Sequence, residues 1–256
     1  MSGLSVVVAA KNEAGVIERC LASVAFADEL VVVDDASTDD TAARAERCGA
    51  RVVVRASGGD FHANKNLGLD LAEGPWLLSL DADEVVTPEL AAELREAIVR
   101  PGYEAYELDR HNYFLGRWIR GCGWSPDPLV RLFRKGITRW PSAIHDTPAV
   151  EPTVRLGRLH APLLHYSYTS FEQYLDKFNR YTTRLAEQER AKGVRVSARN
   201  APILFGAKPA YWFLRKYFLQ KGFRDGGHGL FICLSSAATI AMTYAKLLQG
   251  QDSERE

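Results

Sequence analysis

Apolar runs rich in β-branched residues alternate with helix-like segments along the first hundred residues, and this alternation limits the fold more than any other feature. Strand-like runs occupy residues 4–10, 29–35, 51–55 and 76–80. Helical patterns occupy residues 14–24, 38–48 and 62–73. Strands that are apolar throughout are typical of parallel sheets buried on both faces. The order β-α-β-α-β-α-β therefore predicts an α/β fold with a Rossmann-like, mainly parallel sheet and helices on both faces.

The composition is that of an ordinary globular protein. The 256 residues are 46% hydrophobic and 25% charged, which is enough for one sizeable core. Lys+Arg and Asp+Glu both number 32, so no overall positive charge favours a nucleic-acid partner. The cysteines lie far apart without a Cys-x-x-Cys pair, which suits a reducing cytoplasm. No basic region precedes the first apolar run, so we expect no signal peptide.

Acidic and amide side chains follow three of the predicted strands. Ligands of doubly wound sheets bind beyond the carboxyl ends of the strands, so these side chains should converge on one crevice. If the fourth strand continues through Asp81 and Asp83, their carboxylates project to one side about 6 to 7 Å apart and repel each other. Hard carboxylate oxygens suit Mg²⁺ or Mn²⁺, so this segment predicts a metal and diphosphate site. The residues at the three strand ends are Asn12, Glu13, Asp34, Asp35, Asp81 and Asp83.

A simpler interpretation is that the acidic turn only caps the next helix. Thr87 is a suitable N-cap residue, and Pro88 suits the first helical position.

Three segments resemble a known family. They read "VVVAAKNEAGVIERCLASV", "LVVVDDASTDDT" and "WLLSLDADE". They are similar to the signature segments of family 2 glycosyltransferases, which are inverting enzymes with the GT-A fold that use nucleotide-diphosphate sugars. The rest of the chain, including "LVRLFRKGITRWPSAIHD" and "LLHYSYTSFEQYLDKFNRYTT", resembles the subgroup that contains lipopolysaccharide core β-1,4-glucosyltransferases. The resemblance implies a hexosyltransferase that uses a UDP-sugar, with glucose as the first candidate, and a saccharide acceptor that is lipid-linked or part of the lipopolysaccharide core.

The resemblance also implies roles for single residues, with Mg²⁺ or Mn²⁺ as cofactor. Asp35 would accept a hydrogen bond from the uracil ring. The other residues that it places around the donor are Asn12 and Glu13 in the nucleotide pocket, Lys65 near the pyrophosphate, Asp83 as the principal metal ligand, and Asp81 beside the ribose and the metal.

The middle of the chain is rich in aromatic residues and arginine. Sugar acceptors present apolar ring faces, which tryptophan matches, although core packing is expected for at least one of these tryptophans. Arginines here suit acceptor phosphates, while a solvated arginine is the ordinary alternative. The candidate acceptor residues are Trp118, Trp124, Trp140, Arg117, Arg120, Arg131 and His145.

An inverting transfer also needs a carboxylate that takes the proton from the acceptor hydroxyl. Asp146 is the candidate, because it lies in the polar break "SAIHDTP" directly after His145, which can orient it. The resembling subgroup usually has Glu at this position, so the side chain here is shorter. Asp127, in a loop before a proline, is the runner-up. The spacing of His145, His160 and His165 does not suggest zinc, and we expect structural roles for them.

The last ninety residues predict helices. Ser170 and Gln173 form a capping-box pattern, and the apolar face over residues 171–185 predicts a helix that packs on the catalytic domain. Residues 208–224 combine aromatic and basic side chains without an acid, which suits a membrane surface with anionic lipids. Residues 229–245 are uncharged but shorter than the roughly 20 residues that span a bilayer. A helix that lies in the membrane interface or packs on the protein is therefore favoured over a transmembrane helix, with a soluble helical hairpin or a homodimer interface as the alternative.

The sequence thus predicts a GT-A catalytic domain over residues 1–165 and a helical region over residues 166–256 that binds the cytoplasmic face of the inner membrane. A non-enzymatic nucleotide-sugar-binding protein is one alternative. A haloacid-dehalogenase-type phosphatase, which shares the Asp-x-Asp-x-Val pattern, is disfavoured because no later pair of acids follows a strand. A Rossmann dehydrogenase is disfavoured because no Gly-x-Gly-x-x-Gly follows the first strand.

Overall fold

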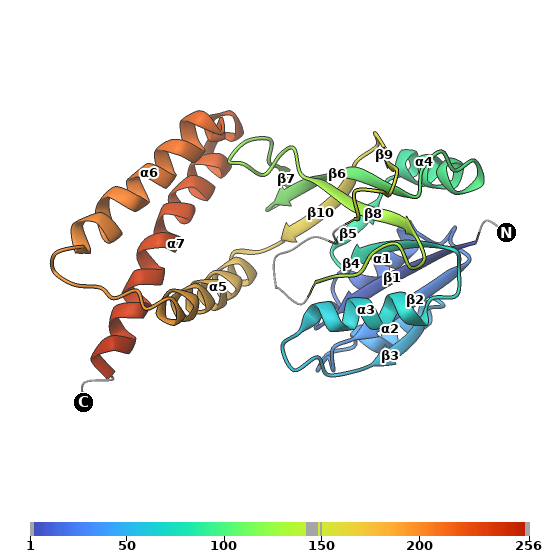
Figure 1. Cartoon of the computed structure of the whole chain (residues 1–256), viewed down its shortest axis with the longest axis horizontal. Coiled ribbons are helices and arrows are strands. Elements are labelled where there is room, and N and C mark those ends of the chain that lie inside the picture. The colour runs from blue at the N-terminus through green and yellow to red at the C-terminus, as the bar shows by residue number, and fades with distance from the viewer. Residues whose placement is uncertain (1–2, 142–147, 149, 254–256) are drawn as a thin grey trace. The chain divides into compact units, whose positions relative to one another are not determined.

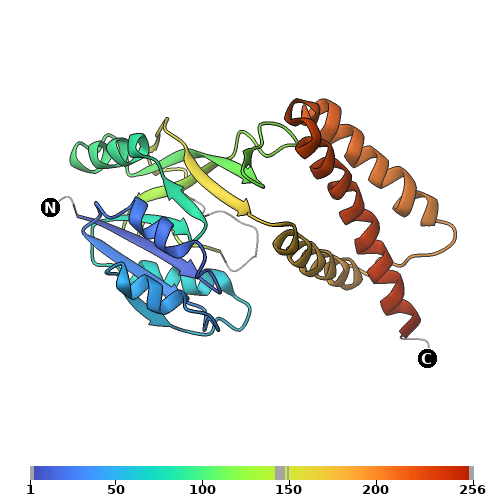
Figure 2. The ribbon, with the colours of Figure 1, turned by 180° about the vertical axis from the view of Figure 1, so that it is seen from behind.

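A computed structural model describes residues 3–141, 148 and 150–253 (Figures 1 and 2). Its internal contacts divide the chain into two compact units. We call Met1–His111 with Asp127–His165 the sheet unit, and Asn112–Pro126 with Tyr166–Glu256 the helical unit.

Ten strands are found among the described residues. The strand order is β3-β2-β1-β4-β8-β6-β10-β5, and β7 and β9 both pair with β6. Their bounds are β1 Leu4–Ala10, β2 Glu29–Asp34, β3 Arg51–Val54, β4 Trp76–Asp81, β5 Glu84–Val86, β6 Ala105–Phe114, β7 Arg117–Trp118, β8 Pro128–Arg134, β9 Leu156–Arg158 and β10 Leu163–Tyr168.

The first four strands form the parallel part of the sheet, as the sequence predicts. β1 pairs in parallel with β2 on one side and with β4 on the other, and β2 pairs in parallel with β3. β8 then runs antiparallel to β4, and β6 runs antiparallel to β8. The result is a mixed sheet with a parallel half, which is the predicted α/β class of fold.

The two faces of this sheet are covered by different helices, α1 (Ile17–Ser23), α2 (Thr41–Arg47) and α4 (Pro88–Val99) on one face and α3 (Phe61–Leu71) on the other. Successive residues of β1 point to opposite faces, so Val6 and Val8 join one core cluster and Val7 joins the other. Gly68 lets α3 approach β1 closely, because a Cβ at this position would lie 2.3 Å from Val7 Cγ1. Both faces are therefore buried, which explains the uniformly apolar strands.

Thr87 caps α4, as the sequence predicts. The Thr87 hydroxyl accepts a hydrogen bond from Leu90 N at 3.1 Å, and Pro88 occupies the first turn. The acidic residues before Thr87 are left for another role.

The helical unit contains α5 (Phe171–Ala191), η1 (Ile203–Ala207), α6 (Lys208–Leu214), η2 (Arg215–Leu219), η3 (Gly222–Asp225) and α7 (Gly226–Ser253). The capping pattern before α5 forms as predicted: Ser170 Oγ accepts from Gln173 N at 3.2 Å, and Gln173 Oε1 accepts from Thr169 N at 2.9 Å. Buried Asp225 joins residues 112–126 to the helices by accepting from Arg120 N and Gly121 N.

Helix α5 contacts the predicted catalytic domain through Phe171 and Tyr174, whose rings lie 6.4 and 5.6 Å from the Phe114 ring, and it has a second partner that the sequence did not predict. α5 packs against α7 in the helical unit, where Lys246 Nζ donates to Asn179 O and Thr183 Oγ1. Phe171, Leu175 and Tyr181, which the apolar spacing assigns to a buried face, are about half exposed. The apolar spacing identified the helix but not its packing against α7.

The segment Gly222–Gln251 is the one described helix that is long and apolar enough to cross a membrane. Length and composition alone also fit the core helix of a soluble protein. About a quarter of its apolar stretch is buried, and Leu230, Leu234 and Met242 are exposed.

Candidate active site

Three parallel strands end side by side in the sheet unit. Ala10 at the end of β1 is paired in register with Asp34 at the end of β2, and Ala9 is paired with Asp81 at the end of β4. The polar residues that follow these strands therefore gather at one edge of the sheet, as the sequence predicts.

The loops after β1 and β2 are joined by hydrogen bonds from Asn12 and Glu13. Asn12 has a left-handed backbone with φ of 55°. Its backbone N–H donates to Ser37 Oγ, and its side-chain Oδ1 accepts from Thr38 N, both at 2.8 Å. The Glu13 amide donates to Thr41 Oγ1 at 2.8 Å. These bonds fix the position of the two loops relative to each other.

Asp35 directly follows β2 and is buried. Its carboxylate accepts from Ser57 N, from Ser57 Oγ at 2.9 Å and from Lys11 Nζ at 3.2 Å. Burial alone would raise the pKa of Asp35, but the hydrogen bonds from Ser57 and Lys11 outweigh it and lower the pKa. Asp35 is thus a carboxylate held in a fixed orientation at the end of β2.

Asp81 and Asp83 do not lie on one continuous strand, which differs from the premise of the sequence argument. β4 ends at Asp81, Ala82 and Asp83 form a turn, and β5 begins at Glu84. The Asp81 amide donates to Glu84 Oε2 at 2.8 Å, which closes the turn. The two aspartates consequently have different neighbours.

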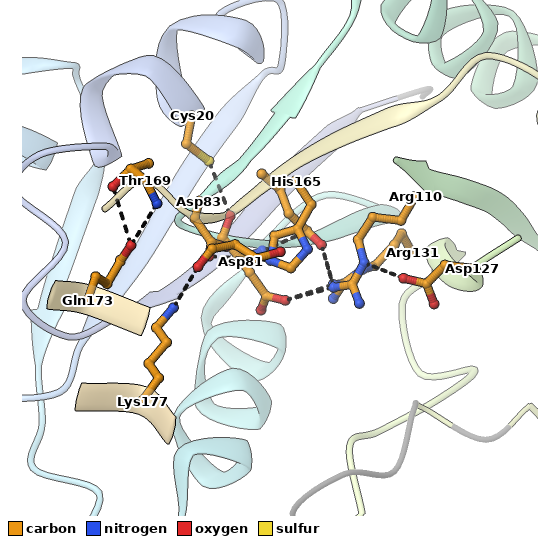
Figure 3. Close-up of polar contacts among 12 residues, drawn as sticks. Cys20, Asp81, Asp83, Arg110, Asp127, Arg131, His165, Thr169, Gln173 and Lys177 are labelled. Atoms are coloured by element: carbon orange, nitrogen blue, oxygen red, sulfur yellow. Dashed lines mark hydrogen bonds and ion pairs between the residues drawn. The ribbon is translucent and has the colours of Figure 1, made fainter. Parts of the chain in front are cut away.

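Asp81 is held between two buried cations. Lys65 Nζ donates to Asp81 Oδ1 at 2.5 Å, and Arg131 Nη2 donates to Asp81 Oδ2 at 2.8 Å. Arg131 Nη2 also donates to Oε1 of Glu84, which is fully buried, at 2.6 Å. Arg110 extends the group by donating to Glu84 and to Asp127 Oδ2 (Figure 3).

We call this set the ion-pair cluster, and it balances three cations against three carboxylates. Its members are Lys65, Asp81, Glu84, Arg110, Asp127 and Arg131.

Charge pairing outweighs burial in setting the pKa of Asp81, Arg110 and Arg131, but not that of Lys65. Burial would raise the pKa of Asp81, but Lys65 and Arg131 hold it well below its usual range. Burial would lower the pKa of Arg131 and of Arg110, but Glu84 raises both, so both guanidinium groups stay charged. For Lys65 the burial effect is the larger, and its pKa is lowered despite the Asp81 carboxylate.

Asp83 lies next to His165. Asp83 Oδ2 is 3.3 Å from His165 Nε2, and both side chains are about 15% exposed (Figure 3). His165 is on β10, where it pairs in register with Glu84 of β5. The sequence favours only a structural role for His165, because a single histidine far along the chain carries no local signal of its neighbour.

Trp140 belongs to the core of the sheet unit. It is 8% exposed, its ring lies 3.8 Å from Lys65 Nζ, and its amide and carbonyl both bond to the Asn66 side chain. His62 Nδ1 contacts Pro141 O at 2.7 Å. Helix α3 therefore anchors the chain just before the segment that holds His145 and Asp146, and those two residues lie outside the described residues.

The other proposed acceptor residues are divided between the two units. Arg131 lies inside the ion-pair cluster of the sheet unit, 2% exposed. Trp118 and Trp124 lie in the helical unit, where the Arg120 guanidinium stacks 4.4 Å above the Trp118 ring and Trp124 O accepts from Asn112. Sequence reasoning missed the ion-pair cluster, although Arg131 within the apolar run "LVRLF" was a signal for buried pairing.

In the described part of the chain, no three His, Cys, Asp or Glu side chains lie close enough together to hold a metal ion by themselves. Asp83 and His165 bring a carboxylate and an imidazole together, and both are ligands that Mn²⁺ accepts.

Comparison with known proteins decides the family. The model of "Glycosyl transferase family 2" matches residues 5–149, which is more than half of the chain and includes every strand end described above. The chain belongs to glycosyltransferase family 2. This membership makes it an enzyme and sets aside the phosphatase and the non-catalytic binding protein.

Two relatives match this glycosyltransferase along nearly its whole length. An uncharacterized glycosyltransferase of Rickettsia felis is 28% identical, over 98% of this chain and 91% of the relative. The lipopolysaccharide core biosynthesis glycosyltransferase LpsC of Rhizobium meliloti is 26% identical, over 96% of this chain and 92% of the relative.

Two solved structures share the fold. The mannosyltransferase PcManGT from Pyrobaculum calidifontis, in complex with GDP-Man and Mn²⁺, has a TM-score of 0.55 at 15% identity and covers 95% of this chain and 86% of its own. TarS from S. aureus, in complex with UDP, has a TM-score of 0.50 at 18% identity and covers 97% of this chain and 92% of its own. The fold is GT-A, with helices beyond the core at the C-terminal end.

Proposed function

We propose that this glycosyltransferase moves a hexose, with glucose as the first candidate, from a UDP-sugar to a lipid-linked or lipopolysaccharide-core saccharide with inversion at the anomeric carbon. The observation that carries the proposal is the meeting of Asp35, Asp81 and Asp83 at the ends of neighbouring strands in a family 2 sheet. The relative named for lipopolysaccharide core biosynthesis, which aligns over almost the whole chain, supports the acceptor class.

The nucleotide would lie against the loops after β1 and β2. Asp35 is ionised and held by Ser57, so its carboxylate can accept from a base N–H in a fixed direction. Asn12 and Glu13 line the same loops, whose shape depends on the bonds to Ser37 and Thr41. The resemblance to UDP-sugar enzymes supports uracil as that base.

Asp83 and His165 fit a divalent cation, Mn²⁺ or Mg²⁺, because they offer two ligands and leave other positions for water and phosphate oxygens. When bound, the cation would neutralise the charge that develops on the leaving diphosphate. Asp81 lies beside this pair, and its two oxygens are already engaged by Lys65 and Arg131. We therefore assign Asp83 as the principal ligand and Asp81 as a neighbour that positions Lys65.

Lys65 supplies a positive charge beside the diphosphate. Its ammonium has three N–H donors and the bond to Asp81 uses one, so donors remain for phosphate oxygens. Trp140 and Asp81 hold the ammonium in place before the donor arrives. This arrangement favours a bound diphosphate without a large rearrangement of the side chain.

Asp146 is the proposed general base. It would take the proton of the acceptor hydroxyl as that oxygen bonds to the anomeric carbon, on the face opposite the bond to UDP that breaks. UDP leaves with the electron pair of that bond, and the sugar is transferred with inversion. The anchoring of Trp140 by Asn66 supports a defined start for the segment that carries Asp146.

The helical unit is proposed to bind the cytoplasmic face of the inner membrane. Around residues 208–224 the side chains of Tyr211, Leu214, Phe218 and Leu219 are more than half exposed, among basic residues. Exposed aromatic and apolar groups mixed with lysine and arginine suit an anionic headgroup layer. This placement would bring the enzyme to a lipid-linked acceptor.

Isothermal titration and a transfer assay test the proposal. UDP-glucose, UDP-galactose, UDP-N-acetylglucosamine and GDP-mannose are each titrated into the full chain with and without Mn²⁺. We expect a UDP-sugar, with UDP-glucose first, to bind tightest and in a Mn²⁺-dependent manner. Preference for GDP-mannose, or no binding of any UDP-sugar, would contradict the proposed donor.

A further inference from the structure

A pocket lies within the helical unit. It has a volume of about 520 Å³ and is built mainly from one face of α5 and the facing side of α7, with contributions from Trp124, Tyr168 and Lys216. All of its lining residues belong to the helical unit, so its geometry is independent of the sheet unit. None of them has a role in the donor site described above.

The pocket is basic. Its lining includes Lys177, Arg180, Arg184 and Lys216, and no Asp or Glu is among the described residues that line it. Arg180 and Arg184 are exposed and form no ion pair with any side chain in the described ranges. Four cations without a carboxylate create a positive potential that favours an anion.

Two of the cations are already held in position. Lys177 Nζ donates to Ser167 O at 3.1 Å and lies 5.2 Å from the Tyr168 ring centroid, and Lys216 Nζ donates to Cys122 O at 2.9 Å. Neutral carbonyl partners orient an ammonium without cancelling its charge, and each ammonium keeps further N–H donors. Burial lowers the pKa of Lys216, as expected for a cation without a carboxylate partner.

Aromatic rings form another wall of the pocket. Tyr168 and Tyr174 lie edge to face with ring centroids 5.1 Å apart, and Trp124 lies 6.2 Å from Tyr168. Tyr181, at 44% exposure, adds a ring that solvent reaches. Aromatic faces of this kind match the apolar faces of sugar rings.

Hydroxyl groups of α7 complete the lining. Ser236 Oγ donates to Ile232 O at 2.8 Å and Thr239 Oγ1 donates to Ser235 O at 2.9 Å, so these donors are satisfied within the helix. Their oxygens can still accept hydrogen bonds from sugar hydroxyls. Cations, aromatic faces and hydroxyl acceptors are therefore combined in one cavity of the size of a small saccharide.

We propose that this pocket binds a phosphorylated saccharide, with Arg180 and Arg184 on the phosphate and the aromatic wall on the sugar ring. Arginine is the side chain best suited to grip phosphate through two parallel hydrogen bonds. The next step rests on the proposed function: the phosphorylated saccharide is part of the acceptor. The pocket then selects acceptors by a feature that the donor site does not contact.

The test is titration of glucose 6-phosphate, inorganic phosphate and methyl glucoside into the full chain, comparing wild type with the double variant Arg180→Gln/Arg184→Gln. We expect glucose 6-phosphate to bind best to wild type and at least about tenfold more weakly to the variant, because two charge-assisted hydrogen bonds are lost. The matched control is Arg195→Gln/Arg199→Gln, which removes the same charge from exposed sites outside the pocket and should bind as wild type.

Tyr181→Ala tests the sugar part at a position where the side chain is 44% exposed. It should reduce the preference for glucose 6-phosphate over inorganic phosphate while leaving the affinity for phosphate unchanged. Equal binding of the two ligands to wild type would overturn the saccharide assignment. Equal binding of glucose 6-phosphate to wild type and to Arg180→Gln/Arg184→Gln would overturn the site itself.

Two further measurements distinguish saccharide binding in this pocket from donor binding and from membrane binding. UDP titration with Mn²⁺ on the same samples reports the donor site, so a failure of the proposed donor is seen independently of the pocket. Flotation with phosphatidylglycerol vesicles reports membrane binding. If Arg180→Gln/Arg184→Gln loses vesicle binding but keeps glucose 6-phosphate binding, the arginines serve a lipid surface and the saccharide proposal is wrong.

Discussion

Asp83 Oδ2 lies 3.3 Å from His165 Nε2, although 82 positions of the chain separate the two residues. The contact exists because β10 runs antiparallel to β5 and sets His165 opposite Glu84, directly beside the turn that carries Asp83. Asp81, two residues earlier, is instead engaged by Lys65 and Arg131. Asp81 therefore belongs to the ion-pair cluster, whereas Asp83 contacts an imidazole.

The metal assignment predicts that Asp83→Asn and His165→Gln each weaken Mn²⁺-dependent UDP binding by at least about tenfold, because each removes one of two protein ligands. Asp83→Asn should also abolish transfer. The measurement is titration of UDP with and without Mn²⁺, and His160→Gln, on an exposed residue, is the control. A Mn²⁺ effect of wild-type size in Asp83→Asn would remove that residue from the metal site.

The ion-pair cluster predicts a large stability cost for Arg131→Met. The substitution removes the Arg131 cation from Asp81 and leaves fully buried Glu84 with Arg110 as its remaining cation in the cluster. Removing one partner of a buried pair typically costs about 3 to 5 kcal/mol. Urea unfolding should show a loss of this size, whereas Arg139→Met, which breaks an exposed pair with Asp70, should lose less than about 1 kcal/mol. Similar losses in the two variants would mean that the cluster contributes little to stability.

The parallel half of the sheet could be predicted because local patterns determine it. Apolar runs such as 4–10 indicate strands buried on both faces, and the polar residues that follow them mark the carboxyl edge. The family model matches residues 5–149, a range that includes these segments. Local patterns thus predict the strands and their burial, although the pairing of β1 with β4 joins Leu4 to Trp76, 72 positions away.

The rest of the fold and of the site depends on contacts between segments that lie far apart along the chain, which a single sequence does not reveal. Arg131 and Glu84 are 47 positions apart, and their contact requires both the β4–β8 register and the turn at Ala82. His165 reaches Asp83 only through the β5–β10 pairing. The apolar spacing of α5 predicts a helix correctly, but spacing alone does not say that α7 is its partner.

The membrane proposal predicts that the full chain floats with vesicles that contain phosphatidylglycerol and that high salt weakens this binding. Phe218→Ser/Leu219→Ser should reduce it by at least about tenfold, because Leu219 is 77% exposed and both side chains would enter the headgroup layer. Val54→Ser/Val99→Ser removes two similarly exposed apolar groups from the sheet unit and is the matched control. Equal flotation with neutral and anionic vesicles would contradict an electrostatic contribution.

The proposal of Asp146 as general base is supported by the contacts that already engage the other carboxylates. Asp35 is held by Ser57 and Lys11, Asp81 and Glu84 are paired with cations, and Asp83 faces His165. Asp127, the runner-up, accepts from Arg110 Nε at 2.8 Å, so it belongs to the ion-pair cluster. An inverting transfer still needs a carboxylate for the acceptor hydroxyl, and Asp146 remains the proposed one.

Asp146→Asn should therefore keep UDP-sugar affinity within a few-fold of wild type and lose at least about a hundredfold in kcat, because a general base typically contributes about 10² to 10⁴ to the rate and little to ground-state binding. Titration gives the affinity and a transfer assay gives kcat. Asp127→Asn is the comparison: it removes a charge from the ion-pair cluster, so it should lower the urea midpoint while the folded enzyme keeps most of its kcat. Near-normal kcat in Asp146→Asn together with an inactive but folded Asp127→Asn would transfer the role of base to Asp127.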